Sequence, residues 1–333
     1  MKGGRVGADS IPLATAREDR AERGLAKIRR DLGPKICGLL EEPNVVEIML
    51  NPDGLLWVER QGKPMEVVGP MAPAAAESLI VAVAGVLGTV VTRDHPILEC
   101  ELPLDGSRFE ALVPPIVSRP TFTIRRKAST VFSLADYVDA GIMTPAQRAA
   151  IEASVAAREN ILIVGGTGTG KTTLVNGVIR AMSDLCPEDR LVIIEDTNEL
   201  QSKAENTVFL RTSDQVDMQR LLRVTMRMRP DRILVGEVRG AEALTLIKAW
   251  NTGHPGGVAT VHANSAHAGL LRLESLCSEA SATPRHDEIA AAVNTVVSIA
   301  KTAKGRRVRE VLKVRGYHGG AYVTEIVKEG TDQ

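Results

Sequence analysis

One eight-residue run constrains this chain more than any other feature: Gly165-Gly166-Thr167-Gly168-Thr169-Gly170-Lys171-Thr172. It matches G-x-x-x-x-G-K-[ST] in full, and it lies between an apolar run, Ile161–Val164, and an apolar-striped helical segment. Glycines allow backbone N–H groups to curl around the phosphates of a nucleoside triphosphate, and the helix N-terminus adds partial positive charge. Pattern and context together predict a phosphate-binding loop in an α/β domain.

The side chains of this loop have separate predicted roles. The Lys171 amine can reach the β- and γ-phosphates, and the Thr172 hydroxyl suits Mg²⁺. The sequence therefore implies ATP and Mg²⁺ as cofactors. The predicted nucleotide-binding residues of the loop are Gly165, Gly166, Thr167, Gly168, Thr169, Gly170, Lys171, Thr172 and Thr173.

Two other apolar runs end in acidic residues. Leu191–Ile194 is followed by Glu195, and Ile233–Val235 is followed by Gly236 and Glu237. The carboxyl ends of parallel strands beside such a loop are where ligands gather, so both glutamates are candidates to hold Mg²⁺ or orient a water. Either carboxylate could instead cap a following helix. Gly236 stands where an aspartate is usual, so Glu237 acts alone or through water.

Two histidines flank a glycine-rich turn and a strand near residue 258. His254 and His262 lack a plausible third ligand, since His267 falls on the next helical stretch, and this argues against a metal site. We predict that both lie at the mouth of the nucleotide site as γ-phosphate sensors or proton-linked contacts. A purely structural role is the alternative.

Arginines are also expected, because guanidinium groups stabilise the charge on a transferred phosphoryl group and can come from a neighbouring subunit. The candidates are Arg108, Arg125 and Arg126 on predicted strands, and Arg239 after the second acidic run. The residues alone do not choose among them, because strand arginines are commonly just solvated.

The patterning changes near residue 145 and indicates two domains. Before it, hairpins such as Val45–Leu50 with Leu55–Arg60 surround a helix that begins at Pro73, which is typical of an α+β domain. Thr144-Pro145 is typical of a helix start, with Thr144 as the N-cap and Pro145 in the first turn. The predicted parts are a disordered tail (residues 1–14), an N-terminal α+β domain (15–127), a linker (128–145) and an α/β ATPase domain with a parallel sheet (146–333).

Composition limits the function classes. The 41 basic and 41 acidic side chains cancel and aromatic content is 3%, which argues against strong direct nucleic-acid binding. The four separated cysteines predict reduced thiols of a cytoplasmic protein. The start of the chain lacks a signal-peptide core. The longest apolar run, Leu79–Val91, has about 13 residues, whereas a membrane span needs roughly 20, so no transmembrane segment is expected.

Four boxes in order resemble those of the secretion and traffic ATPases, the hexameric motors of type II and type IV secretion and of type IV pili. They are the phosphate-binding loop, Leu191–Leu200 (LVIIEDTNEL), Arg229–Glu242 (RPDRILVGEVRGAE) and Thr252–Ser265 (TGHPGGVATVHANS). The resemblance covers about residues 25 to 315 and is greatest to the conjugal-transfer ATPases of type IV secretion systems. The missing tetracysteine module separates the chain from the type II assembly ATPases.

The resemblance implies a RecA-like fold for the second domain and a role for each site residue. It implies that Glu195 is the general base, that Glu237 supports Mg²⁺ and the γ-phosphate, and that His262, with His254 as an alternative, senses the γ-phosphate. It also implies nucleotide contacts from Arg108 and Arg125 in the first domain, with Arg126 as the alternative to the second of these.

The function implied is that of a cytoplasmic ATPase, acting as a homo-oligomer, most simply a hexamer, against inner-membrane components of a conjugation machine. It would power pilus assembly or the transfer of DNA or protein. A pilus retraction motor and a nucleotide-dependent switch or scaffold with little turnover are the alternatives. A DNA translocase is disfavoured by the charge balance.

Overall fold

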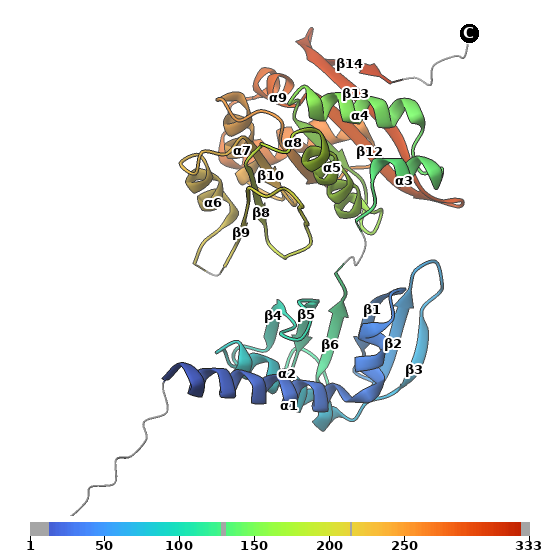
Figure 1. Cartoon of the computed structure of the whole chain (residues 1–333), viewed down its shortest axis with the longest axis vertical. Coiled ribbons are helices and arrows are strands. Elements are labelled where there is room, and N and C mark those ends of the chain that lie inside the picture. The colour runs from blue at the N-terminus through green and yellow to red at the C-terminus, as the bar shows by residue number, and fades with distance from the viewer. Residues whose placement is uncertain (1–12, 128–130, 214, 328–333) are drawn as a thin grey trace, which may run out of the picture. The chain divides into compact units, whose positions relative to one another are not determined.

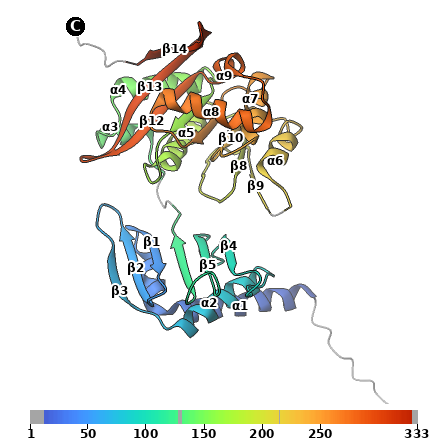
Figure 2. The same cartoon turned by 180° about the vertical axis from the view of Figure 1, so that it is seen from behind.

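The computed structural model describes residues 13–127, 131–213 and 215–327, with side chains from residue 21. The chain divides into two compact units, Met1–Ser129 and Thr130–Gln333 (Figures 1 and 2). The predicted disordered tail lies, except for residues 13 and 14, outside the described residues. All four cysteines are free thiols.

The first unit is an antiparallel sheet with two helices on one side (Figure 1). The strand order is β3-β2-β1-β6-β5-β4. Pro73 occupies the first turn of the second helix, as predicted. The elements are α1 (Leu13–Glu41, kinked at Gly33), β1 (Val45–Leu50), β2 (Leu55–Arg60), β3 (Glu66–Pro70), α2 (Pro73–Val86), β4 (Ile97–Glu101), β5 (Arg108–Leu112) and β6 (Thr121–Arg125).

Apolar and polar side chains alternate along these strands, which gives the sheet one buried face and one polar face. Ile48, Phe109 and Ile124 are fully buried in a core shared with α1 and α2. Their sequence neighbours on the other face include Arg108 and Arg125. The strand alternation therefore places the two predicted arginines on the face that the helices do not cover.

The second unit is an eight-stranded sheet of order β14-β13-β12-β7-β11-β10-β8-β9. The six strands from β12 to β9 in that order run parallel, and β13 and β14 extend the sheet antiparallel. The strands are β7 (Ile161–Val164), β8 (Leu191–Glu195), β9 (Thr207–Arg211), β10 (Arg232–Val235), β11 (Val258–Val261), β12 (Thr295–Thr302), β13 (Gly305–His318) and β14 (Ala321–Ile326).

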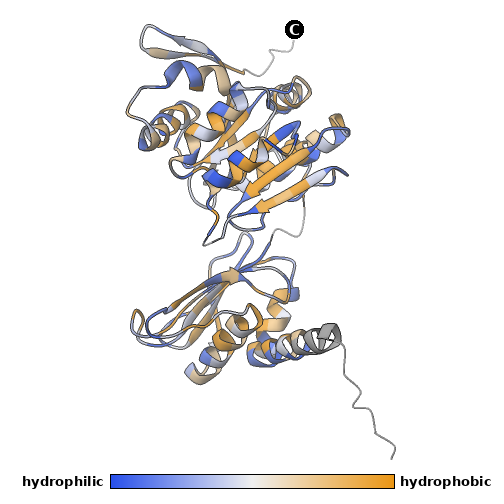
Figure 3. Cartoon of the chain, turned by 90° about the vertical axis from the view of Figure 1, so that its left-hand side faces the viewer, coloured by the Kyte–Doolittle hydropathy of each residue, from blue (hydrophilic) through white to orange (hydrophobic). Residues whose placement is uncertain are grey.

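Helices cover both faces of this sheet, with one hydrophobic core on each side. Its central strands are buried along their whole length and are strongly hydrophobic in Figure 3, as expected for a sheet covered on both sides. One face carries α3 (Leu134–Asp139), α4 (Pro145–Ala156) and α5 (Lys171–Leu185); the other carries α6 (Met218–Thr225), α7 (Glu242–Asn251), α8 (Ala266–Ala280) and α9 (His286–Ala292).

The predicted linker range contains ordered structure of the second unit. Thr144 caps α4 as predicted, in a capping box with Gln147. Upstream of it, α3 forms within residues 128–145, and Leu134 and Tyr137 are buried against α5. These apolar side chains are too few to form a helical period, which is why the sequence does not reveal this short helix.

Candidate active site

The phosphate-binding loop connects β7 to α5, as the sequence predicts. Two of its glycines need the left-handed backbone that only glycine adopts without strain: Gly168 (φ 68°) and Gly170 (φ 97°), the N-cap of α5. Gly165 is needed for space, since a β-carbon there would lie 2.4 Å from the Ile299 carbonyl oxygen and 2.6 Å from Thr169 Oγ1. The glycines therefore form a backbone cradle that larger residues would fill.

Lys171 is buried in the first turn of α5. Its Nζ donates to the carbonyl oxygens of Gly165 and Gly166, both at 3.0 Å, and lies 3.3 Å from Nδ1 of His262. Thr172 and Thr173 follow in the same turn and are partly exposed. A phosphate in the cradle can replace these neutral carbonyls as the partner of the ammonium group.

Glu195 ends β8 and its carboxylate is buried. Oε2 accepts hydrogen bonds from the backbone N–H groups of Glu199 (2.8 Å) and Leu200 (3.0 Å), whereas Oε1 is buried and has no hydrogen-bond partner. Burial raises the pKa of this carboxyl, and the two N–H donors and Arg211 offset part of that rise. A carboxylate with one oxygen fixed and the other without a hydrogen-bond partner suits a group that takes a proton.

Glu237 follows β10, at the same edge of the sheet. Its Oε2 accepts from Arg239 Nε (2.8 Å) and Nη2 (2.5 Å). Its Oε1 lies 2.5 Å from His262 Nε2 but outside hydrogen-bonding geometry, and it has no other donor. A β-carbon on Gly236, where an aspartate is usual, would lie 3.2 Å from Glu195 Cβ, a tight contact.

The two histidines lie at opposite edges of the sheet. His262 follows β11, whose Val261 pairs with Val164, so it lies beside the start of the phosphate-binding loop. His254 precedes β11, and its Nδ1 lies 3.2 Å from the Pro230 carbonyl oxygen. The prediction that both line the nucleotide site is therefore wrong for His254, because a strand separates the two.

Arg108 and Arg125 are direct cross-strand partners on β5 and β6 of the first unit, and Arg125 also pairs with Glu47 on β1. Arg126 differs, because its guanidinium donates to the Glu42 carbonyl oxygen within the same unit. Arg125 is exposed, whereas Arg126 is partly buried with this backbone partner. The arrangement favours Arg125 over Arg126 as a residue available to a ligand.

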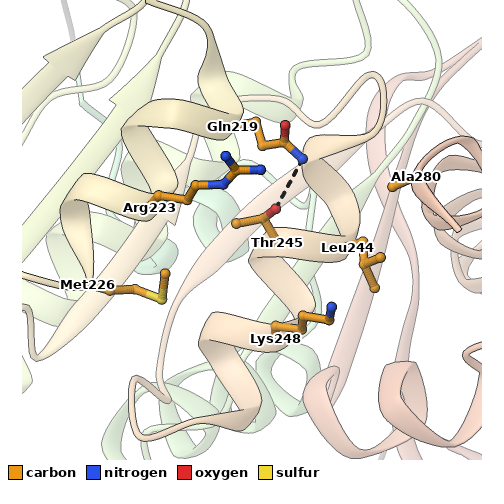
Figure 4. Close-up of a pocket in the computed structure, with 7 residues that line it drawn as sticks. All are labelled: Gln219, Arg223, Met226, Leu244, Thr245, Lys248 and Ala280. Carbon is orange, nitrogen blue, oxygen red and sulfur yellow. Dashed lines mark hydrogen bonds between the residues drawn. The ribbon is translucent and has the colours of Figure 1, made fainter.

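In the described residues, no cluster of metal-ligating side chains marks this edge of the sheet. No group of three His, Cys, Asp or Glu side chains that could hold a metal ion occurs in the described parts of the chain. A hollow of about 340 Å³ lies elsewhere, between α6 and α7 (Figure 4). Its lining contains none of the predicted site residues: Gln219, Arg223, Met226, Leu244, Thr245, Lys248 and Ala280.

Comparison with known sequences shows the family of this chain. The family model described as "Type II/IV secretion system protein" matches residues 35–314. The chain belongs to the type II/IV secretion system protein family. It is 54% identical over 303 residues to "Probable conjugal transfer protein TrbB" of Sinorhizobium fredii, covering 91% of this chain and 93% of that protein. "Conjugal transfer protein TrbB" of Rhizobium radiobacter is also 54% identical, with 91% and 94% covered.

The fold is similar to that of a solved protein, the Legionella pneumophila ATPase DotB, whose structure was determined by X-ray crystallography. The TM-score is 0.61 at 19% sequence identity, and the match covers 85% of this chain and 80% of that chain. With its complete phosphate-binding loop, the chain is a P-loop ATPase of the secretion family, with a RecA-like domain and a smaller α+β domain. No described helix is long and apolar enough to cross a bilayer.

Two side chains that no motif identifies also contact this family site. Asn176 on α5 bonds to the loop that holds Glu195, and Arg306 on β13 lies against Gly170. A polar residue within the apolar stripe of α5 is the signal that could have identified Asn176. Nothing in the local sequence around Arg306 indicates that it lies beside the phosphate-binding loop.

Proposed function

We propose that this chain hydrolyses ATP at the phosphate-binding loop, with Glu195 as the general base that orients the attacking water. The observation that carries the proposal is the buried Oε1 of Glu195, which has no hydrogen-bond donor. Buried polar atoms are rarely left unpaired, so this oxygen implies a ligand at the sheet edge where Lys171 and Glu237 both contact His262. ATP and Mg²⁺ fit this donor set.

Each residue of the site would then have a separate role. Lys171 would exchange the loop carbonyls for phosphate oxygens, and Thr172 and Glu237 would hold Mg²⁺, which prefers oxygen ligands and keeps several waters. When bound, Mg²⁺ would neutralise phosphate charge. His262, beside both Lys171 and Glu237, would respond to the γ-phosphate.

Two arginines of the first unit complete the proposed site. Arg108 and Arg125 are cross-strand partners on β5 and β6, and two neighbouring guanidinium groups would bind the oxygens of one phosphate chain. They would add to the positive charge of Lys171 that stabilises the transferred phosphoryl group.

At the level of the machine, we propose a cytoplasmic hexamer at the inner face of a conjugative type IV secretion system. It would act on inner-membrane components and power pilus assembly or the transfer of DNA or protein. Two relatives with 54% identity named as conjugal transfer proteins support this proposal. Restoration of conjugation in a deletion strain would support it; restoration of twitching alone would instead indicate a pilus retraction motor.

Two substitutions test the site. Lys171→Ala should abolish ATP turnover, and Glu195→Gln should keep nucleotide binding while stopping phosphate release. Glu205→Gln, an exposed acid between β8 and β9, is the matched control and should behave as the unmodified chain. Full turnover in Lys171→Ala would contradict the site. Binding without phosphate release in the unmodified ring would instead identify a nucleotide-dependent switch.

A further inference from the structure

The β12–β13 hairpin extends past the phosphate-binding loop. β12 pairs in parallel with β7 as far as Ser298 opposite Val164, and it continues to Thr302 after β7 has ended. The Ile299 carbonyl oxygen then lies only 2.4 Å from the place that a β-carbon of Gly165 would occupy. The tip of the hairpin therefore begins beside the start of the phosphate-binding loop.

Arg306, the second residue of β13, lies against the far end of the same loop. A β-carbon built on Gly170 would be 3.1 Å from Cδ and 3.3 Å from Nε of Arg306. Gly170 is the N-cap of α5, where backbone N–H groups and the helix dipole attract anions. An exposed guanidinium group is thus held next to a second source of positive potential.

The hairpin has an unbalanced charge. Residues 301–309 (KTAKGRRVR) hold five basic side chains and no acidic one. Lys301 and Arg306 are direct cross-strand partners, an arrangement of like charges that destabilises a hairpin. Within the described parts of the chain neither of them forms a salt bridge. An anion between the pair and the N-terminus of α5 would remove this repulsion.

We propose that Arg306, with Lys301 opposite it, binds the phosphates of the nucleotide held by the loop. The ligand class is a nucleoside di- or triphosphate, and the inference rests on the proposed function. It adds a contact from the C-terminal hairpin that none of the four sequence boxes contains. The alternative is that both side chains are solvated and make no contact.

Binding of a non-hydrolysable ATP analogue by calorimetry tests this contact. Arg306→Gln should weaken binding about tenfold, the loss expected for one charge-assisted hydrogen bond. Arg309→Gln is the matched control: it removes an exposed basic residue of the same strand and should leave the affinity unchanged. Unchanged thermal unfolding of both variants in the absence of nucleotide excludes misfolding.

Lys171→Ala separates the inference from the proposed function. If Lys171→Ala loses binding but Arg306→Gln does not, the Arg306 contact is refuted and the site stands. If neither substitution changes the affinity, the proposed function fails as well. If Arg306→Gln and Arg309→Gln weaken nucleotide binding equally, the effect comes from the overall positive charge of the hairpin, and a specific Arg306 contact is refuted.

Asn176 supports an independent inference about the base. It is buried on α5, with Nδ2 donating to the Glu199 carbonyl oxygen (3.1 Å) and Oδ1 accepting from the Gln201 N–H (2.9 Å). These two bonds flank the N–H groups of Glu199 and Leu200 that hold Glu195 Oε2. The side-chain amide therefore fixes the backbone segment that fixes the base.

We infer that Asn176 is a positioning residue, which links the helix of the phosphate-binding loop to the carboxylate of Glu195. This too rests on the proposed function. It does not touch the reacting atoms, so it should affect turnover through the geometry and protonation of Glu195. Loss of the two N–H donors would leave only Arg211 to oppose the effect of burial and would raise the carboxyl pKa further.

The test compares two buried asparagines that each bridge two backbone segments. Asn176→Ala should lower turnover about tenfold, as expected for a misplaced base, leave the KM for ATP unchanged, and shift the acidic limb of the pH–rate profile upward. Asn160 is also buried and bridges two backbone segments, Ala292 O and Gly257 N, but it precedes β7 at the opposite edge. Asn160→Ala should lose stability without moving the profile.

Two results would overturn the positioning role: an unchanged profile and turnover in Asn176→Ala, or the same change in both alanine variants. Glu195→Gln distinguishes this failure from that of the proposed function. If Glu195→Gln still releases phosphate at the normal rate, the base assignment itself is wrong. If Glu195→Gln is inactive and Asn176→Ala is normal, only the positioning role is refuted.

Discussion

Glu195 and Glu237 share an arrangement in which one carboxylate oxygen is fixed and the other is buried without a donor. For Glu195 the fixed oxygen is held by backbone N–H groups, and for Glu237 by the Arg239 guanidinium. Such half-satisfied acids cost stability in the folded chain. This cost suits a site that must bind and release a charged ligand.

The first prediction concerns the stability of the Glu195 site. Because burial raises its pKa in the folded chain, the folded state binds more protons than the unfolded state above the ordinary value of 4.5. Stability is therefore lost as pH rises from 4.5 through the raised value. Glu195→Gln should have a higher Tm than the unmodified chain at neutral pH, with the difference vanishing near pH 4.5 by scanning calorimetry. A pH-independent difference would contradict this assignment.

A second prediction concerns Gly236, which stands where an aspartate is usual. Gly236→Asp adds a β-carbon 3.2 Å from Glu195 Cβ and a second carboxylate beside the first. Crowding should destabilise the second unit by about 1–3 kcal/mol, and turnover should fall because like charge disfavours the ionised base. Gly236→Ala is the matched control and should show only the first effect. Equal activity of both variants in a phosphate-release assay would argue against charge repulsion.

Several residue-scale features could be predicted from the sequence and others could not. Lys171 is identified by the phosphate-binding motif, and Glu195 and Glu237 are identified because each lies at the carboxyl end of a buried parallel strand. The choice of Arg125 over Arg126, and the removal of His254 from the site, depend on which backbone carbonyl each side chain meets. Such contacts join residues distant in sequence and leave no local pattern.

At the scale of elements, β11 is held between β7 and β10 by close backbone packing at its start. A β-carbon on Gly257 would lie 2.2 Å from the Ile233 carbonyl oxygen and 2.3 Å from Trp250 Nε1. Trp250 Nε1 donates to that same carbonyl oxygen. The glycine thus allows α7 to pack on the sheet at the strand that carries His262.

The third prediction follows from this packing. Gly257→Ala should destabilise the second unit by about 2–3 kcal/mol, because backbone and an indole ring cannot move aside easily. Urea unfolding monitored by Trp250 fluorescence measures it, with Trp57 of the first unit replaced by Phe. Gly166→Ala is the control in the same unit, since the nearest atom to its added carbon, Thr169 Cγ2, lies 3.7 Å away in ordinary van der Waals contact. A loss below about 0.5 kcal/mol would contradict the packing argument.

At the scale of the whole molecule, each unit has its own sheet and its own hydrophobic core. The phosphate-binding loop and both glutamates belong to the second unit, whereas Arg108 and Arg125 belong to the first. Binding and full turnover are therefore expected to depend on different parts of the chain.

The fourth prediction tests this division. A fragment of residues 130–333 should unfold cooperatively and bind ATP, but it should hydrolyse ATP about a thousandfold more slowly, the size of a lost arginine contribution. The full-length double variant Arg108→Gln/Arg125→Gln should reproduce much of this loss. Arg126→Gln, the neighbouring arginine with a backbone partner, is its control. Undiminished turnover of the fragment would remove the two arginines from the proposed site.

The sequence by itself determined the phosphate-binding loop, the acids that end two strands and the two-part organisation. These follow from local patterns: the spacing of the glycines, apolar runs of strand length and helix caps. Only the tertiary structure decided that β12 pairs with β7 and brings Arg306 to Gly170, and that Asn176 fixes the loop behind Glu195. The reason is physical, because strand order and buried hydrogen bonds between distant segments are fixed by the packing of the whole sheet.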